Sequence, residues 1–248
     1  MNKNLHKLYY KDYFKDKGKD LDFSYLEPKR DVPISVKEAI KHNNDALCAA
    51  NLLYVIPRIP EVSHHLEFEL LYPGLVTGIG IGHEASIEGE FKLGMHFDWT
   101  YGMPIIYGSS VKGVLKSYFK DFCDFGDADK NAIENDIFEG EGKSIYNRDI
   151  FFDAVLIKAD SKGRILCPDS ITPHKGPLKN PLPITFMKIA PGCKIEFRFK
   201  LVETRIPKKE GEDIVISAEE KLMIFKKILE TVGIGAKTNV GYGQLKAV

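Results

Sequence analysis

The chain beyond residue 61 alternates between two hydrophobic periods, and the order of that alternation restricts the fold more than any other feature. Two stretches carry the helical period of about 3.6 residues, namely 109–122 and 217–232. Four others alternate apolar and polar residues or form a short apolar run, as strands do: 65–72, 149–157, 194–202 and 242–248. The order is therefore strand, helix, strand, strand, helix, strand, which is that of the split βαβ, or ferredoxin-like, arrangement of α+β proteins.

The clearest helical pattern is SAEEKLMIFKKILETV, residues 217–232. Ser217 and Glu220 have the spacing of a capping box, in which each side chain accepts a hydrogen bond from the other residue's backbone N–H. Gly233 is the glycine expected directly after a helix end. We expect the inner face of this helix to comprise Leu222, Phe225, Leu229 and Val232.

Two segments stand outside this order. Residues 1–60 open with many lysines and tyrosines, and a helical pattern begins near Ser35. We predict a helical N-terminal extension over residues 1–60 that packs on a main domain formed by residues 61–248. Within the main domain, SIEGEFKL (86–93) alternates Ile87, Phe91 and Leu93 with polar residues, which predicts one arm of an inserted β-hairpin.

Composition excludes several classes of protein. No run reaches the roughly 18 consecutive apolar residues of a membrane span, and the lysine-rich start has no apolar segment of the kind found in signal peptides. The four cysteines form no CxxC pair and are predicted to be reduced thiols rather than zinc ligands or disulfides: Cys48, Cys123, Cys167 and Cys193. We therefore expect a cytoplasmic protein without a membrane segment, a metal or a cofactor.

The net charge is zero, because 35 basic residues balance 35 acidic ones. A free-standing nucleic-acid-binding protein usually carries a basic excess, so this balance counts against one. It allows a subunit that contacts nucleic acid along one strip while its other faces meet proteins. Most of the basic residues are lysines, which suit phosphate contact better than the bidentate recognition of bases.

The glycine-rich stretch TVGIGAKTNVGYGQL (231–245) admits two interpretations. In the first it is a tight turn, with Gly233 ending the helix and Gly241 and Gly243 opening the last strand. In the second, consecutive backbone N–H groups form an anion-binding concavity to which Lys237 adds a positive charge. The turn leaves Gly235 and the Lys-Thr-Asn set unexplained, yet the sequence alone favours it. The P-loop spacing GxxxxGK[ST] is absent.

The start of the helix in YGMPIIYGSSVKGVLKSYF (101–119) is a second candidate site. Ser109 or Ser110 is the natural N-cap, and Lys112 lies in the first turn. A cation is mildly unfavourable there, because the helix N-terminus already carries partial positive charge. An anion bound by free N–H groups, serine hydroxyls and Lys112 would resolve the conflict. An exposed lysine without a function explains the residues equally well.

No catalytic arrangement is evident in the sequence. The histidines, which include His83, His96 and His174, show neither HxxxH nor HExxH spacing. His174 follows a proline and is more typical of a loop residue than of a ligand or base. Asp98 and Asp153 belong to no recognisable pair of carboxylates. We therefore predict that the chain is not an enzyme.

At its two glycine-serine stretches the sequence resembles the RAMP superfamily of CRISPR effector proteins, and within it the sixth-subunit family of the type III-B (Cmr) complex. The central match is GIGIGHEASIEGEFKLGMHFDWTYGMPIIYGSSVKGVLKSYF (78–119). Here Tyr107 and Val111 stand where the family usually has proline and leucine. Further blocks that resemble the family are NLHKLYYKDYF (4–14), FFDAVLI (151–157), DSITPHKG (169–176), PLPITFMKIAPGCKIEFRF (181–199) and GIGAKTNVGYG (233–243).

This resemblance implies an RNA-recognition-like RAMP fold in a non-catalytic subunit at one end of an antiviral ribonucleoprotein. Such a subunit helps to hold the 3′ part of the CRISPR RNA and contacts other RAMP and small subunits, with target RNA nearby. The resemblance also reverses the preference for a simple turn, because the glycine-rich loop of RAMP proteins usually faces RNA. The residues expected to contact RNA are Ser109, Ser110, Lys112, Gly233, Gly235, Lys237, Thr238, Asn239 and Tyr242, with Tyr242 stacking on a base.

Two other functions remain open at this point. The first is a RAMP-type endoribonuclease that processes CRISPR precursor RNA, with His174 or another histidine as general base. Such enzymes typically have two tandem domains and an early histidine, whereas one domain is predicted here. The second is a small-molecule enzyme with a phosphate site at Ser110, for which the sequence offers no catalytic partner.

Overall fold

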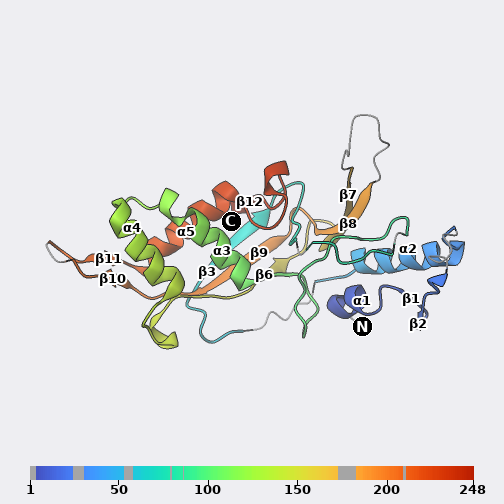
Figure 1. The fold of residues 1–248 in the computed structure, drawn as a ribbon, viewed down its shortest axis with the longest axis horizontal. Coiled ribbons are helices and arrows are strands. Elements are labelled where there is room, and N and C mark those ends of the chain that lie inside the picture. The colour runs from blue at the N-terminus through green and yellow to red at the C-terminus, as the bar shows by residue number, and fades with distance from the viewer. Residues whose placement is uncertain are drawn as a thin grey trace.

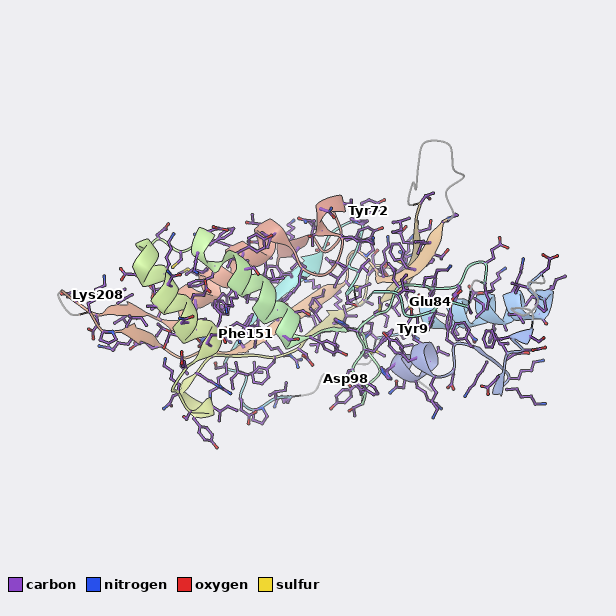
Figure 2. All side chains as sticks on the ribbon, viewed as in Figure 1. Tyr9, Tyr72, Glu84, Asp98, Phe151 and Lys208 are labelled. Carbon is purple, nitrogen blue, oxygen red and sulfur yellow. The ribbon has the colours of Figure 1, made fainter. Side chains whose placement is uncertain are left out.

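The computed structural model describes residues 4–24, 31–52, 58–78, 80–85, 87–172, 183–208 and 211–248. Figure 1 shows an elongated molecule. Helices α3, α4 and α5 lie with the main sheet in one half, and the N-terminal elements α1, α2, β1 and β2 lie at the opposite end. Figure 2 labels Lys208 near the tip of the β10–β11 hairpin at the first end and Tyr9 towards the other.

The main sheet has the predicted ferredoxin-like order. Its strands run β12-β3-β9-β6-β4, and each neighbouring pair is antiparallel. Numbered by chain order within the motif, the four principal strands therefore read 4-1-3-2. Their bounds are β3 His64–Leu70, β6 Ala154–Lys158, β9 Lys194–Lys200 and β12 Leu245–Ala247. Two short strands extend the sheet, namely β4 (Ile105–Ile106) beside β6 and β5 (Ile150–Phe151) beside β9. The α+β prediction is confirmed.

The two long helices of the motif also form where the sequence predicts them. Helix α3 spans Gly108–Tyr118 and continues as a 3₁₀ turn, η2 (Phe119–Asp121). Helix α5 spans Ala218–Val232, and the Ser217–Glu220 capping box is present. Phe225 of α5 packs against Phe151 of β5 and Phe199 of β9, with ring centroids 5.8 and 5.6 Å apart. The helices therefore cover the face of the sheet that carries the aromatic side chains.

The inner face of α5 differs from the prediction at Lys221. Phe225, Ile228 and Leu229 are buried as a helical stripe, and Lys221 is fully buried beside them. The Lys221 ammonium donates hydrogen bonds to Asp149 Oδ2 at 2.6 Å and to the Val202 carbonyl at 2.7 Å. Burial lowers the pKa of Lys221 and raises that of Asp149, while the attraction between the two charges opposes both shifts. This ion pair joins α5 to the chain that enters β5.

Two predicted strands are altered by a single side chain each. The run 149–157 is divided into β5 and β6, because Asp153 leaves the sheet so that its Oδ1 can accept a hydrogen bond from the Gly108 amide at 2.7 Å. The strand predicted at 86–93 does not form in its described part, residues 87–93, which make a turn instead: the buried Glu90 carboxylate accepts hydrogen bonds from the amides of Ala85 and Ile87. The arms of this loop meet at the isolated bridge between Ile81 and Leu93 and through backbone hydrogen bonds from the Gly82 and Gly94 amides to the Lys92 and Gly80 carbonyls.

The N-terminal segment contains α1 (Leu5–Tyr10), the short hairpin β1 (Lys15–Asp16) and β2 (Lys19–Asp20), and α2 (Ile34–Cys48). Helix α2 begins one residue before the predicted start. The Tyr9 hydroxyl donates to the Leu93 carbonyl at 2.6 Å, and the Tyr13 hydroxyl accepts from the Phe91 amide at 2.7 Å. The segment therefore packs on the loop before β4, and its apolar side chains join the main hydrophobic core. The division at residue 60 stays a prediction.

Elements that the sequence analysis did not predict project from this framework. Two are hairpins: β7 (Leu166–Ile171) with β8 (Ile184–Ile189), and β10 (Thr204–Ile206) with β11 (Ile214–Ile216). Helix α4 (Asp127–Glu134) continues into a π-helical turn, η3 (Asn135–Glu139). Short 3₁₀ turns occupy η4 (Ile145–Asn147) and η5 (Thr238–Val240). In the described part of the chain, no helix is long and apolar enough to cross a membrane.

Candidate nucleic-acid interface

The glycine-rich loop between α5 and β12 folds back on the chain that follows β3. Gly233 ends α5 at φ +69°, and its amide donates to the Leu229 carbonyl. The Ala236 amide donates to the Val76 carbonyl at 2.7 Å, and the Gly243 amide donates to the Gly74 carbonyl at 2.8 Å. Both ends of the loop are therefore hydrogen-bonded to residues 74–76.

Two glycines are required by contacts within the chain itself. At Gly235, where φ is +94°, an added Cβ atom would lie 2.5 Å from the Val76 carbonyl oxygen. At Gly243, where φ is +74°, it would lie 1.8 Å from the Ile234 carbonyl oxygen. Both positions combine a left-handed backbone with close approach, which only glycine tolerates. The turn interpretation thus explains Gly235, which the sequence left unexplained.

The centre of the loop nevertheless has the geometry of an anion site. Lys237 is left-handed (φ +61°, ψ +32°) and precedes the right-handed 3₁₀ turn η5. Within the described chain, no group accepts a hydrogen bond from the backbone amides of Lys237, Thr238 and Asn239. A left-handed residue followed by a right-handed one turns three successive N–H groups into one concavity, which is a recurrent binding site for phosphate oxygens. Lys237 is half-buried and Asn239 exposed, so solvent reaches the concavity.

Tyr242 does not fit the predicted role in base stacking. Its side chain is buried, its hydroxyl donates to Asp169 Oδ2 at 2.7 Å, and its ring packs edge-on against Phe186. The Lys188 ammonium covers the ring at 5.5 Å from the centroid. Burial and the Asp169 carboxylate both raise the pKa of Tyr242, so it remains a neutral donor. The expectation of stacking is wrong, because the ring anchors the loop to the β7–β8 hairpin.

The start of α3 is capped differently from the prediction. The helix begins at Gly108, and its N-cap is Tyr107, which makes no side-chain capping bond. Asp153 instead accepts from the Gly108 amide, and a Cβ atom on Gly108 would lie 2.2 Å from the Phe151 carbonyl oxygen; Figure 2 labels Phe151 at this point. The expected serine N-cap is therefore wrong, and Ser109 and Ser110 occupy the second and third helical positions.

Lys112 also has a partner that the sequence could not show. Its ammonium lies 3.9 Å from Glu139 Oε2, and Lys116 lies 2.5 Å from Oε1 of the same carboxylate. The hydrogen bond from Lys116 and the Lys112 charge lower the pKa of Glu139. An external anion is thus not required to balance Lys112. Ser109 and Lys112 still line a cavity of about 250 Å³ together with Arg148.

Contacts connect the two predicted stretches across the fold. Val76 bridges to Ala236 in the loop, while the Thr77 hydroxyl accepts a hydrogen bond from the His96 amide at 2.8 Å. The buried His96 ring then stacks on Tyr107, the N-cap of α3, at 4.1 Å between centroids. His96 Nδ1 is buried without a hydrogen-bond partner in the described structure. Thr77 and His96 therefore connect the glycine-rich loop to the start of α3. The spacing of these residues in the sequence does not indicate this connection.

Two of the residues considered for catalysis, His83 and Asp153, make hydrogen bonds that stabilise the fold. His83 is buried, and its two ring nitrogens lie 2.9 and 3.1 Å from the carbonyl oxygens of Phe91 and Tyr9. Burial lowers the pKa of His83, which favours its neutral form. Asp153 caps α3, and His174 lies outside the described residues.

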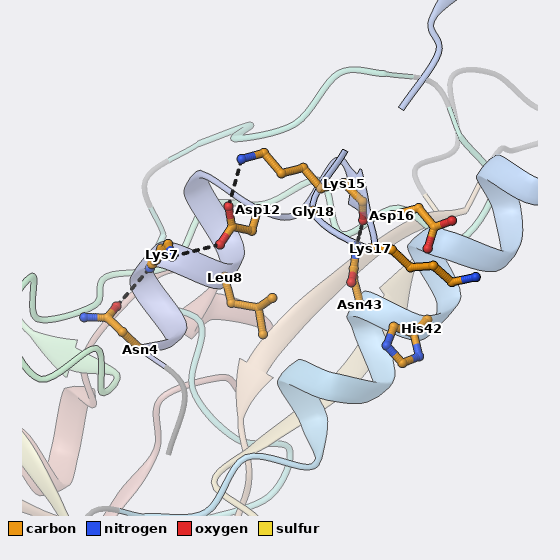
Figure 3. Close-up of a pocket in the computed structure, with 10 residues that line it drawn as sticks. All are labelled: Asn4, Lys7, Leu8, Asp12, Lys15, Asp16, Lys17, Gly18, His42 and Asn43. Atoms are coloured by element: carbon orange, nitrogen blue, oxygen red, sulfur yellow. Dashed lines mark hydrogen bonds and ion pairs between the residues drawn. The ribbon is translucent and has the colours of Figure 1, made fainter. Parts of the chain in front are cut away.

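A larger cavity of about 760 Å³ lies within the N-terminal elements (Figure 3). Helix α1, the β1–β2 hairpin and α2 all contribute to its wall. Asp12 is paired with both Lys7 and Lys15, at 3.6 and 3.1 Å, and Asn43 Nδ2 donates to the Lys15 carbonyl. Asp12 therefore balances part of the positive charge that Lys7 and Lys15 bring to the wall of this cavity.

Comparison with known proteins identifies the class to which this fold and interface belong. Residues 67–246 match the model of the RAMP superfamily, so the chain belongs to that superfamily. It is similar to the CRISPR system CMR subunit Cmr6 of Saccharolobus solfataricus, with 31% identity over 157 residues. That match covers 61% of this chain and 48% of the relative, so the chain spans about half the length of the protein it matches.

A solved structure shares the fold at low identity. A chain in the cryo-EM structure of the type III-B Cmr-beta complex bound to cognate target RNA superposes with a TM-score of 0.52. The two sequences are 21% identical, and the superposition covers 74% of this chain and 57% of the other. This likeness supports the RAMP fold.

Proposed function

We propose that the chain is a non-catalytic subunit of a cytoplasmic type III-B CRISPR ribonucleoprotein that acts against foreign RNA. In this role it binds the 3′ part of the CRISPR RNA and neighbouring RAMP and small subunits. Membership of the superfamily and the similarity to a Cmr subunit support this assignment. The zero net charge agrees with a subunit that meets RNA on a limited area.

One observation carries the RNA-binding part of the proposal. The amides of Lys237, Thr238 and Asn239 are unpaired within the described chain and follow the left-handed residue that gathers them into one concavity. Backbone N–H groups of this kind bind phosphate without reading the base, which suits a guide RNA whose sequence varies. The α3 start contributes Ser109, whose amide also has no partner in the described structure. Lys112 at the start of α3 is paired with Glu139. We therefore propose the glycine-rich loop, rather than the start of α3, as the main RNA contact.

The direct test is isolation of the chain with its neighbours. We expect the tagged chain, expressed together with the genes that flank it, to retain other RAMP subunits and a discrete CRISPR RNA after extensive washing. Sequencing the bound RNA should return guide sequences with a common boundary at one end. A folded chain that repeatedly emerges without RNA and without other subunits would refute the assignment.

The non-catalytic part needs its own test. We expect the purified chain to leave CRISPR repeat RNA intact in the absence of metal, because His83 and Asp153, two of the residues considered for catalysis, are held in structural contacts. A preparation made identically from cells with an empty vector controls for contaminating nucleases. Cleavage at one defined site, present only with the chain, would establish the alternative of a precursor-processing endoribonuclease.

A further inference from the structure

A cluster of metal-binding side chains lies on the sheet face opposite α3 and α5. In β3, Leu66 and Phe68 point to the helices, so His65 and Glu67 lie on the other face. Glu196 lies on that same face of β9. The histidine nitrogen and the two carboxylate groups each offer a ligand atom, and these atoms all lie within 4.8 Å of one another.

The strand register fixes this arrangement. Glu67 is the direct cross-strand partner of Glu196 in the antiparallel pairing of β3 with β9. Like charges directly opposite each other destabilise a sheet unless a cation lies between them. Arg198 Nε occupies only one oxygen, Glu196 Oε1, at 2.6 Å. Within the described chain, the Glu67 carboxylate has no hydrogen bond or ion pair, so this site has an unbalanced negative charge.

We propose that His65, Glu67 and Glu196 bind one divalent transition-metal ion of the Zn²⁺ class. Zn²⁺ bonds of about 2.1 Å place tetrahedral ligand atoms roughly 3.4 Å apart, so the three side chains must close separations of at most 4.8 Å to that value. The ligand from Glu196 is Oε2, since Arg198 holds Oε1. Three protein ligands leave the remaining coordination positions to water.

The ligand set selects among cations. Mg²⁺ and Ca²⁺ prefer sites made entirely of oxygen ligands, whereas an imidazole nitrogen favours Zn²⁺, Fe²⁺, Ni²⁺ and Cu²⁺. An ion can reach the cluster from solvent, because His65 is exposed and both Glu67 and Glu196 are half-buried.

The test is a metal titration of the untagged full-length chain after treatment with a chelator. We expect calorimetry to detect one Zn²⁺ ion per chain, and Co²⁺ in its place to give the visible absorption of a low-coordinate nitrogen and oxygen site. Excess Mg²⁺ should not displace either ion. Absence of stoichiometric uptake by the folded chain would overturn the proposal.

Two variants and a matched control locate the site. His65→Ala and the nearly isosteric Glu67→Gln should each weaken Zn²⁺ binding by at least about tenfold, since even the outer-shell partners of metal ligands contribute that much. His64→Ala is the control: His64 is adjacent in sequence but lies towards α5, 3.7 Å from Glu219. If His64→Ala weakens binding as much as His65→Ala does, the uptake is adventitious and the proposal fails.

Discussion

Replacing Lys237 with alanine removes the one cationic side chain of the loop centre and leaves the loop backbone nearly unchanged. Lysine and alanine both carry a Cβ atom, so each bears the same strain at the φ of +61° found there. The Lys237 ammonium forms no ion pair within the described chain, so the substitution leaves no charged partner unpaired. Any change in RNA binding therefore reports on the lysine itself.

The expected magnitude follows from the count of charges. One lysine neutralises one phosphate, which contributes about 0.7 to the slope of log affinity against log salt for a single strand. The slope of Lys237→Ala should be shallower by that amount. Between about 50 and 200 mM salt, the affinity of the wild type should then fall by roughly 2.6-fold more than that of the variant. The three backbone amides remain, so the variant should still bind.

The assay is RNA binding by the complex reconstituted with its partner subunits, measured at several salt concentrations with two guide RNAs of unrelated sequence. Both guides should lose affinity equally, because phosphate contact does not depend on sequence. Lys162→Ala, which removes an exposed lysine from the turn after β6, is the charge-matched control and should reproduce the wild-type curve. Coincident curves for Lys237→Ala and wild type would refute the contact between the Lys237 ammonium and a phosphate.

Three further predictions concern the framework of the interface. Gly235→Val should lower the free energy of unfolding by about 2 kcal/mol or more, because a β-branched residue would adopt a left-handed backbone and clash with the Val76 carbonyl; an unchanged urea midpoint would contradict the close approach. Lys221→Met should cost about 3–5 kcal/mol by leaving Asp149 buried without its partner, and adding Asp149→Asn should recover part of that loss; equal stability of the single and double variants would argue against an isolated buried charge. Tyr242→Phe should cost about 1.5–3 kcal/mol through the lost hydrogen bond to the Asp169 carboxylate, while the folded variant should bind RNA as the wild type does; a selective loss of RNA affinity would indicate a direct role for the hydroxyl.

The sequence by itself determined the elements that depend on local interactions. Hydrophobic period sets which face of a helix or strand is buried, and a capping box involves residues three apart, so α5 with its cap and the alternation of β9 were readable from short windows. The order of these elements then restricted the α+β topology, because few chain paths connect such an order in one sheet. The motifs that resemble the RAMP superfamily are also short stretches of sequence, so the resemblance could be recognised without the structure.

The tertiary structure decided the features that join residues distant in sequence. Asp153 replaced the serine cap of α3 from 45 positions away, and Asp169 took the Tyr242 hydroxyl that a base-stacking ring would leave free. Spacing along the chain likewise gave no sign of His65, Glu67 and Glu196 as a cluster, because strand register alone brings Glu196 beside the other two. Whether a glycine serves a turn or a ligand is equally non-local: it depends on which backbone approaches it, and at Gly235 that backbone is the carbonyl of Val76.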